Sequence, residues 1–379
     1  MKKLFILIAA AIFVAGSVLP ALAQDKAEWG FYGSARMWTA WEMKDKKTVA
    51  AAGLLGTPGL AGFDDDDLNW DIQSNSRIGA NVKFGNVGGR FEYGTGINLR
   101  LLYGTWNFGP GTLLVGQDYT PLFFPVSDQC GYGGGDCGLI FWGTVYSGRI
   151  PQLKLRMGGF QFALLTPNRV QKLTAGDFPL GRDTDTTLPE VEASYTFNLG
   201  PAALMLGGAY KTYDVRGVTA AALEKDYSVD SWLLNAAGRM NFGPFYVNFS
   251  LAYAKNMGDY GFTGDIASSL KSAEYVAATD SIEDAKNLLA ALVLGFRLSD
   301  AVKLEGGFGY LVGEKDFGGV EEKNTVMTYY VQMTWSPAKN VFIVPEFGVI
   351  DYGDYKETGL ADVDLGKTTY LGVKWQINF

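Results

Sequence analysis

The chain has no histidine among its 379 residues. That absence excludes Ser-His and Cys-His nucleophile systems and every form of histidine acid–base chemistry. An enzyme built on carboxylates alone is left open, but no paired-carboxylate motif supports one. We therefore expect a protein that is not an enzyme, with no catalytic residues, no metal site and no cofactor.

Long apolar runs are also absent, except at the N-terminus. There, Lys2 and Lys3 precede an apolar stretch that ends at a small-residue cleavage pattern, Ala21-Leu22-Ala23. This arrangement is typical of a secretory signal peptide, so we expect residues 1–23 to be removed and the mature domain to span 24–379. A membrane-anchoring helix is the alternative. Loss of the two lysines changes the formal net charge from −8 to −10.

Cysteine is scarce, with only Cys130 and Cys137 in the whole chain. In an exported protein this closely spaced pair predicts a small disulfide loop. Two free thiols are the alternative. A zinc site is disfavoured, because two thiolates without histidine leave the tetrahedral shell incomplete.

What the chain does contain is glycine and aromatic residues. It has 49 Gly, 20 Tyr and 24 Phe, and its mean hydropathy is +0.03. Beyond residue 23 no apolar run approaches the ~18 residues of a membrane helix. An exported chain of this composition favours extended β structure.

The apolar residues alternate with polar ones over long stretches. At the C-terminus, Leu371, Val373, Trp375, Ile377 and Phe379 share one face of a strand. The pattern recurs upstream in segments of ten or more residues, whereas globular strands average about five or six. Tilted strands that cross a bilayer need roughly 9–11 residues, and they must close into a barrel so that every backbone polar group is paired. The sequence therefore predicts an all-β, transmembrane antiparallel barrel.

The turns give the number of strands. Asn-(Phe/Leu)-Gly-Pro occurs at 107–110, 198–201 and 241–244, and we interpret it as a tight turn in which Gly takes a positive φ. Short joins are expected at 85–89, 107–111, 157–160, 198–202, 241–245, 298–301 and 336–340. Longer connections are expected at 43–67, 94–98, 119–149, 167–187, 214–228, 256–284, 314–322 and 352–364. These connections join about sixteen strands, with short turns on the periplasmic side and long loops outside.

With these features the chain resembles a general bacterial outer-membrane porin. The final strand ends in an aromatic residue, as in Trp375–Phe379, and resembles the signal read by the barrel-assembly machinery. Leu113–Pro121 is similar to the strand before the constriction loop in homotrimeric porins of sulfate-reducing and related bacteria. The resemblance implies a homotrimeric, water-filled channel in the outer membrane, exported through the periplasm. Its partners would be membrane lipid, lipopolysaccharide and small hydrophilic solutes, with no nucleic acid.

The resemblance further implies that the third long loop, 119–149, folds inward and narrows the pore, with the predicted Cys130–Cys137 disulfide limiting its freedom. Alternation places several basic residues on the lumen side: Arg36, Arg77, Arg90, Arg100, Lys154 and Arg156. Asp118, Asp128 and Asp136 are expected opposite them. Of these, Arg36, Arg77, Arg100 and the three aspartates are the candidate constriction residues. Ordinary solvated lumen side chains are the alternative, and the sequence does not decide between anion and cation preference.

Two other functions stay open. A substrate-specific channel, for a sugar for instance, would need an aromatic track, and five aromatic residues are expected to face inward: Tyr32, Trp38, Trp106, Tyr246 and Tyr330. A structural or adhesion barrel with a plugged lumen is the other possibility. The acidic run Asp64–Asp67 in the first long loop could bind divalent cations, although it lacks the spacing of a calcium loop.

Overall fold

The computed structural model describes residues 26–45, 54, 65–131, 138–167, 183–218, 224–261, 264, 266–276 and 279–379. The predicted signal peptide, 1–23, lies outside these residues, as do Asp64, Asp136 and Cys137. Within the described part of the chain, no helix has the length and apolar character needed to cross a membrane.

The described strands close into an antiparallel barrel, as the alternation predicted, and it has the sixteen strands expected from the turns. The first half of the wall is formed by β1 (Glu28–Lys44), β2 (Asp65–Ile72), β3 (Arg77–Phe84), β4 (Val87–Gly94), β5 (Leu99–Asn107), β6 (Thr112–Tyr119), β7 (Arg149–Met157), β8 (Phe160–Leu165) and β10 (Glu190–Leu199). The second half is formed by β11 (Ala202–Val218), β12 (Glu224–Phe242), β13 (Phe245–Lys255), β16 (Lys286–Arg297), β17 (Val302–Phe317), β18 (Val320–Ala338), β19 (Val341–Asp351) and β22 (Lys367–Asn378). Strands β2 and β3 occupy one position, because both pair with β1, and β22 pairs with β1 to close the wall.

The connections at one end of the barrel contain short strands and 3₁₀ turns. These are β9 (Asp183–Asp185), β14 (Glu274–Val276), β15 (Ser281–Glu283), β20 (Asp354–Glu357), β21 (Val363–Asp364), and the 3₁₀ turns η2 (Thr95–Ile97), η4 (Met257–Tyr260) and η5 (Ser268–Lys271). We call this the loop end of the barrel and the opposite one the short-turn end.

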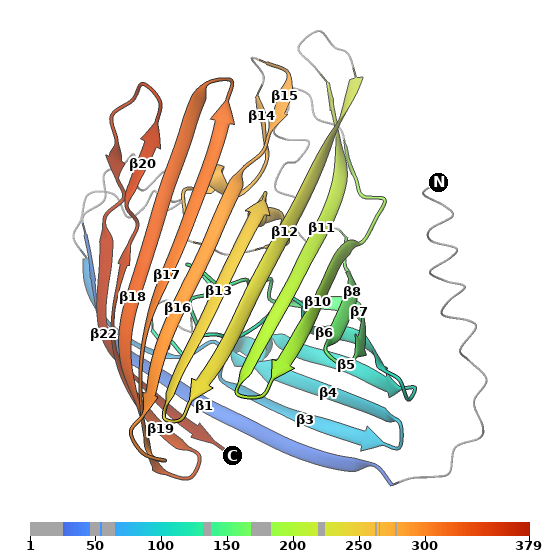
Figure 1. Cartoon of the computed structure of the whole chain (residues 1–379), viewed down its shortest axis with the longest axis vertical. Coiled ribbons are helices and arrows are strands. Elements are labelled where there is room, and N and C mark those ends of the chain that lie inside the picture. Colours follow the sequence, from blue (N-terminus) through green and yellow to red (C-terminus); the bar gives the residue numbers. More distant parts are fainter. Residues whose placement is uncertain are drawn as a thin grey trace.

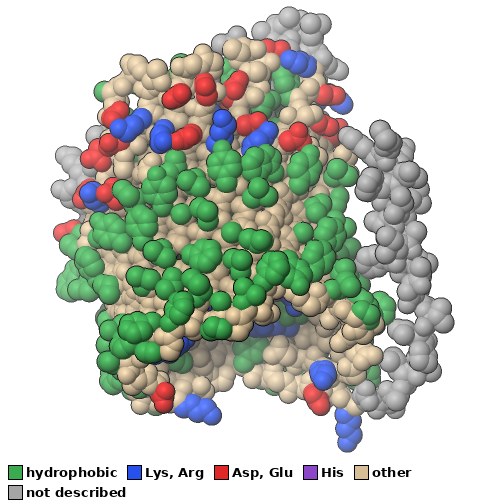
Figure 2. All heavy atoms as spheres, viewed as in Figure 1, with side chains coloured by type: hydrophobic (Ala, Val, Ile, Leu, Met, Phe, Trp, Pro, Cys, Tyr) green, Lys and Arg blue, Asp and Glu red, His purple; other side chains and the backbone are tan. Residues whose placement is uncertain are grey.

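The alternation sorts side chains onto the two faces of the wall. Outward residues are apolar and exposed, for example Trp41, Leu371 and Ile377. Their neighbours point inward, because the side-chain period of a strand is two, and many of them are polar or small. Figure 2 shows the resulting hydrophobic band across the face of the wall in view, with charged side chains gathered above it near the loop end. Such a band is what a strand barrel presents to lipid.

The predicted tight turns lie together at the short-turn end. All seven short joins are found, and in the Asn-(Phe/Leu)-Gly-Pro phrases the glycines adopt positive φ values of 96° at Gly109, 70° at Gly200 and 64° at Gly243. An L side chain resists this conformation, whereas glycine adopts it freely. The repeated phrase is therefore a turn-forming sequence.

Two of the predicted long connections were wrong. Strands β11 and β12 remain paired as far as Val218 and Glu224, and β17 and β18 as far as Phe317 and Val320. The charged residues in 214–228 and 314–322 indicated loops. Here they sit in strands that project past the hydrophobic band, where an outward charge meets water rather than lipid. The acidic run was also expected in a loop, but Asp65, Asp66 and Asp67 belong to β2, which begins at Asp65.

The wall is uneven in height. Strands β3 to β8 have six to nine residues each, whereas β11, β12, β17 and β18 have 16 to 19. Figure 1 shows the tall strands β11, β12, β17 and β18 rising above a low wall that contains β3, β4 and β5.

Candidate pore constriction

We call the connection between β6 and β7, residues 120–148, L3; its described residues, 120–131 and 138–148, lie inside the barrel. Its described first part follows the inner wall and is hydrogen-bonded to one strand after another. The contacts are Ser194 of β10 with Pro121 (2.8 Å), Asn235 of β12 with Leu122 (3.3 Å), Asn248 of β13 with Val126 (2.7 Å), Tyr330 of β18 with Ser127 (2.7 Å) and Tyr370 of β22 with Gln129 (2.9 Å). L3 thus covers the inner face from β10 round to β22.

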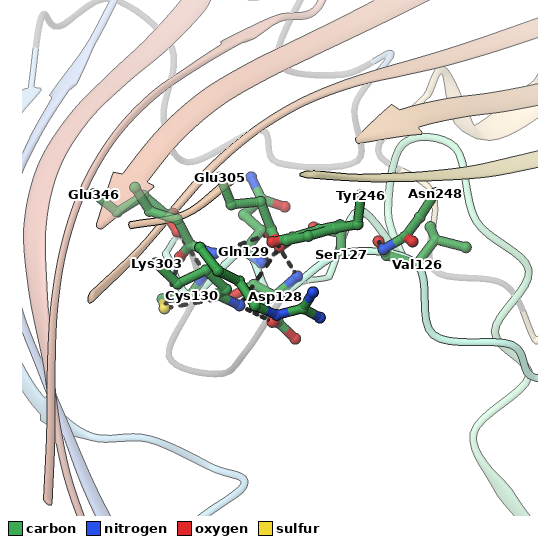
Figure 3. Close-up of polar contacts among 12 residues, drawn as sticks. Val126, Ser127, Asp128, Gln129, Cys130, Tyr246, Asn248, Lys303, Glu305 and Glu346 are labelled. Atoms are coloured by element: carbon green, nitrogen blue, oxygen red, sulfur yellow. Dashed lines mark hydrogen bonds and ion pairs between the residues drawn. The ribbon is translucent and has the colours of Figure 1, made fainter. Parts of the chain in front are cut away.

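Three buried glutamates of the wall hold the L3 backbone. Glu192 accepts the N–H of Leu122 (3.2 Å), and Glu305 accepts that of Asp128 (2.9 Å). Glu346 accepts two N–H groups, from Cys130 (2.7 Å) and Gly131 (2.8 Å). Each carboxylate satisfies backbone donors that the loop would otherwise bury unpaired. Figure 3 shows Glu305 and Glu346 beside the loop residues they bind.

Tyrosines of the wall complete these anchors. Tyr246 and Tyr330 donate their hydroxyls to Glu305, at 2.5 and 2.6 Å, and Tyr370 donates to Glu346 at 2.9 Å. Tyr246 and Tyr330 were predicted to belong to an aromatic track. They point inward as expected, but they are buried beneath L3 and their hydroxyls are committed to a carboxylate.

The inner wall of β1 and β3 to β5 is basic. Arg36, Arg77, Arg90 and Arg100 of β1, β3, β4 and β5 all point inward, as the alternation predicted. At their centre lies Glu92, which is completely buried and accepts bonds from Arg100 (2.7 Å), Arg90 (3.1 Å) and Tyr32 (2.8 Å), with Arg77 at 3.7 Å. One carboxylate therefore faces several guanidinium groups, and the cluster keeps a positive surplus.

From the sequence we expected Asp118 to lie opposite this basic wall, but it does not. It belongs to β6, because that strand extends to Tyr119, and it pairs with Lys154 (2.6 Å) and Arg156 (2.7 Å) of neighbouring β7. The side chain is therefore part of the basic wall and neutralises one of its charges.

Asp128 does come from L3. It forms an ion pair with Lys303 of β17, drawn in Figure 3, and both residues line a polar cavity of about 360 Å³ together with Arg36 and Lys374. Asp128 of L3 and Arg36 of the basic wall therefore line the same cavity. Asp136, the third predicted aspartate, lies outside the described residues.

The cysteine pair is described only at Cys130. Its side chain is buried, with Sγ 3.3 Å from Oε1 of Gln332. Cys137 lies outside the described residues, so the disulfide stays a prediction. Phe379, the predicted assembly signal, exchanges two backbone hydrogen bonds with Gly33 of β1, and its ring is exposed at the barrel surface.

A second connection also folds inward. We call residues 256–285 L6, and its η4 turn is buried within the barrel. Lys211 of β11 donates to the carbonyl of Asp259 (3.0 Å), whose carboxylate accepts from Ser231 (2.7 Å). Apolar residues of L3 and L6 then form an interior cluster with the wall, including Leu122, Trp142, Met257, Ile266 and Leu270. Nothing in the sequence pattern signalled this second inward loop.

Comparison with solved structures gives the architecture a context. OmpT of Vibrio cholerae is 14% identical with a TM-score of 0.57, and the match covers 94% of this chain and 100% of that one. The fold is that of an outer-membrane β-barrel. An anion-selective porin from Comamonas acidovorans is 12% identical (93% and 100% covered, TM-score 0.56), and OmpF of Salmonella typhi is 12% identical (92% and 97% covered, TM-score 0.53). No protein-family model and no curated protein sequence matches the chain.

The predicted aromatic track does not assemble along the barrel lumen. Trp106 faces outward, opposite exposed Val87, because a register shift between β4 and β5 near Leu99 reverses the faces along β5. Trp38 is buried and packs edge-on against Tyr370. A bulge of this kind leaves no mark in the sequence alternation, so Trp106 could not be placed from the sequence.

Proposed function

We propose that the protein is an outer-membrane porin, a water-filled channel for passive diffusion of small hydrophilic solutes and ions. The observation that carries this proposal is the path of L3, whose described first part is held against the inner wall from β10 to β22. Arg77, Arg90 and Arg100 of the basic wall bond to Glu92 instead. Barrels of about sixteen strands leave an aqueous channel, whereas about eight strands are filled by side chains. A loop fixed inside such a lumen suits a size filter.

In this proposal the constriction lies between L3 and the basic wall. Arg36 and Arg77 line it from the wall, and Asp128 and Asp136 from L3. Arg100, which is only 4% exposed, acts within the wall through its bond to Glu92. Asp118 acts within the wall by holding Lys154 and Arg156. The channel performs no catalysis and needs no cofactor.

The loop end would face the cell exterior and the short-turn end the periplasm, following export and removal of residues 1–23. Phe379 would be read by the barrel-assembly machinery, and the outer surface would contact membrane lipid and, near the loop end, lipopolysaccharide. We propose in addition that Leu113–Pro121 corresponds to the strand before the constriction loop in homotrimeric porins of sulfate-reducing and related bacteria.

We also propose a homotrimer that meets through the low wall. Strands β3 to β8, with six to nine residues, are at or below the lower limit of the roughly 9–11 residues that a bilayer crossing needs, so contact with a second copy suits this wall better than lipid. Its outer face carries exposed Ile78, Leu102 and Val115. An in-vitro folded form of Vibrio cholerae OmpT, 14% identical with a TM-score of 0.54, is described as a trimer.

A second candidate is a structural barrel with a closed lumen. The observation in its favour is the interior cluster that L3 and L6 form together, because apolar contacts of this kind can also plug a barrel. A sugar-specific channel has less support, since the aromatic track does not assemble.

Swelling of liposomes that contain the refolded protein tests these functions. A porin admits a series of neutral sugars at rates that fall with sugar size and rise linearly with concentration. A saturable rate for one sugar would favour the substrate-specific channel. If gel mobility shows that the protein is folded and yet no solute causes swelling, the porin function is refuted and the closed barrel is favoured.

A further inference from the structure

Acidic and basic side chains around L3 differ in their exposure to solvent. The acidic ones are mostly inaccessible: Glu92 and Glu192 have no exposed surface, Glu346 is 1% exposed, and Glu305 is 3% exposed. Asp118 is buried as well, at 5%. Asp128 differs from these carboxylates because its side chain is exposed, and it forms an ion pair with Lys303.

The buried carboxylates are also chemically occupied. Glu192, Glu305 and Glu346 accept N–H groups of L3, and Glu92 accepts from arginines. Donor dipoles directed at a carboxylate offset its field, so these groups attract few cations from the lumen. They hold the protein together rather than face the solute.

The basic side chains keep their ends in the lumen. Arg77, Arg90, Arg156 and Lys303 retain between about one-fifth and two-fifths of their side-chain surface, and they come from four different strands. Arg239 and Arg297 add exposed positive charge toward the short-turn end, where their guanidinium groups lie over Phe124 and Tyr246. Positive charge thus faces the lumen on several sides of L3.

We propose that the channel prefers anions, and that Arg77, Arg90 and Arg156 determine this preference. The inference rests on the proposed porin function and names the solute class, small inorganic or carboxylate anions. Guanidinium groups suit carboxylate and other oxyanions because their N–H groups form a planar fork. Charged side chains that line a pore set its ion preference, so the lumen decides selectivity although the whole chain carries a formal charge of −8.

Reversal potentials of the refolded protein in a planar bilayer, under a tenfold KCl gradient with 0.1 M on the dilute side, test this proposal. We expect chloride to be preferred over potassium, with the preference falling as both solutions are made more concentrated, since the Debye length shrinks from about 10 Å at 0.1 M to about 3 Å at 1 M. Arg90→Gln and Arg156→Gln should each lower the chloride-to-potassium permeability ratio by about twofold, as expected for one charge within a Debye length of the ion path.

Arg216→Gln is the matched control. It removes the same charge from an exposed pair with Asp226 at the loop end of β11 and should leave the ratio unchanged. Gel mobility shows whether each variant is folded. The salt dependence of the permeability ratio is measured on the unsubstituted protein, so that test does not depend on any variant folding. A channel that conducts but prefers potassium, shows no preference, or keeps its ratio in both lumen variants overturns the anion proposal alone. A folded protein that never conducts overturns the porin function itself.

Discussion

Glu346→Gln should loosen the tip of L3 while leaving the barrel folded. In the structure the Glu346 carboxylate receives the N–H groups of Cys130 and Gly131 and the hydroxyl of Tyr370, all within 2.9 Å. Glutamine has nearly the same shape but offers one carbonyl oxygen and one NH₂ group. One backbone donor of L3 then faces another donor.

The size of the effect follows from these contacts. Losing a hydrogen bond to a charged acceptor and leaving a buried N–H without a partner costs about 3 kcal/mol. Burying a neutral amide in place of a carboxylate recovers about 1 kcal/mol of that loss. The net cost of about 2 kcal/mol raises the open population of the loop tip roughly 30-fold.

Hydrogen–deuterium exchange of the refolded protein measures this population at the amides of Cys130 and Gly131. We expect those amides to exchange roughly 30-fold faster in Glu346→Gln, with unchanged exchange in the wall strands. Glu314→Gln is the control, because Glu314 is an exposed acid near the loop end of β17 and pairs with Lys323. If the two variants exchange alike at the loop tip, the anchoring role assigned to Glu346 is wrong.

Three further predictions concern other parts of the molecule. Lys211→Met should lower the free energy of unfolding in urea by about 3 kcal/mol, because it breaks a buried charge contact that holds L6; an unchanged midpoint would contradict this. Gly243→Ala should cost about 1 kcal/mol in the same assay, since Ala resists the positive φ of that turn, whereas Gly30→Ala, in a strand with open space around it, should cost less. Hydrogen bonds from Lys225 and Tyr227 lower the pKa of Asp280 to about 2, so their support of the β14–β15 hairpin is complete above about pH 4 and is lost as the pH falls through 2. Exchange in that hairpin, corrected for intrinsic rates, should therefore rise between pH 4 and pH 2, and Asp280→Asn should abolish the change.

Much of the fold could be predicted from the sequence, because its signals are local. Alternation fixes which face of a strand meets lipid, and the Asn-(Phe/Leu)-Gly-Pro phrases need glycine at a positive φ, so the short turns could be located. The strand ends at the loop end could not. Beyond the lipid a strand carries charged residues without penalty, and its composition then matches that of a loop.

The site was less predictable, because its contacts join distant residues. Inward orientation of Arg36, Arg77 and Arg100 followed from alternation alone. The grouping of three of the arginines around Glu92 depends on strand register, and the use of Glu305 and Glu346 as anchors depends on where L3 passes. Neither register nor loop path is written in a local pattern, and both were found only in the structure.

The central claim is that the barrel is an open, constricted channel. Single-channel recording of the refolded protein in a planar lipid bilayer tests it most directly. The account predicts stepwise increases in conductance as channels insert, grouped in threes if the trimer proposal also holds. Folded protein that inserts into the bilayer and yet produces no conductance steps at any salt concentration or voltage would contradict it.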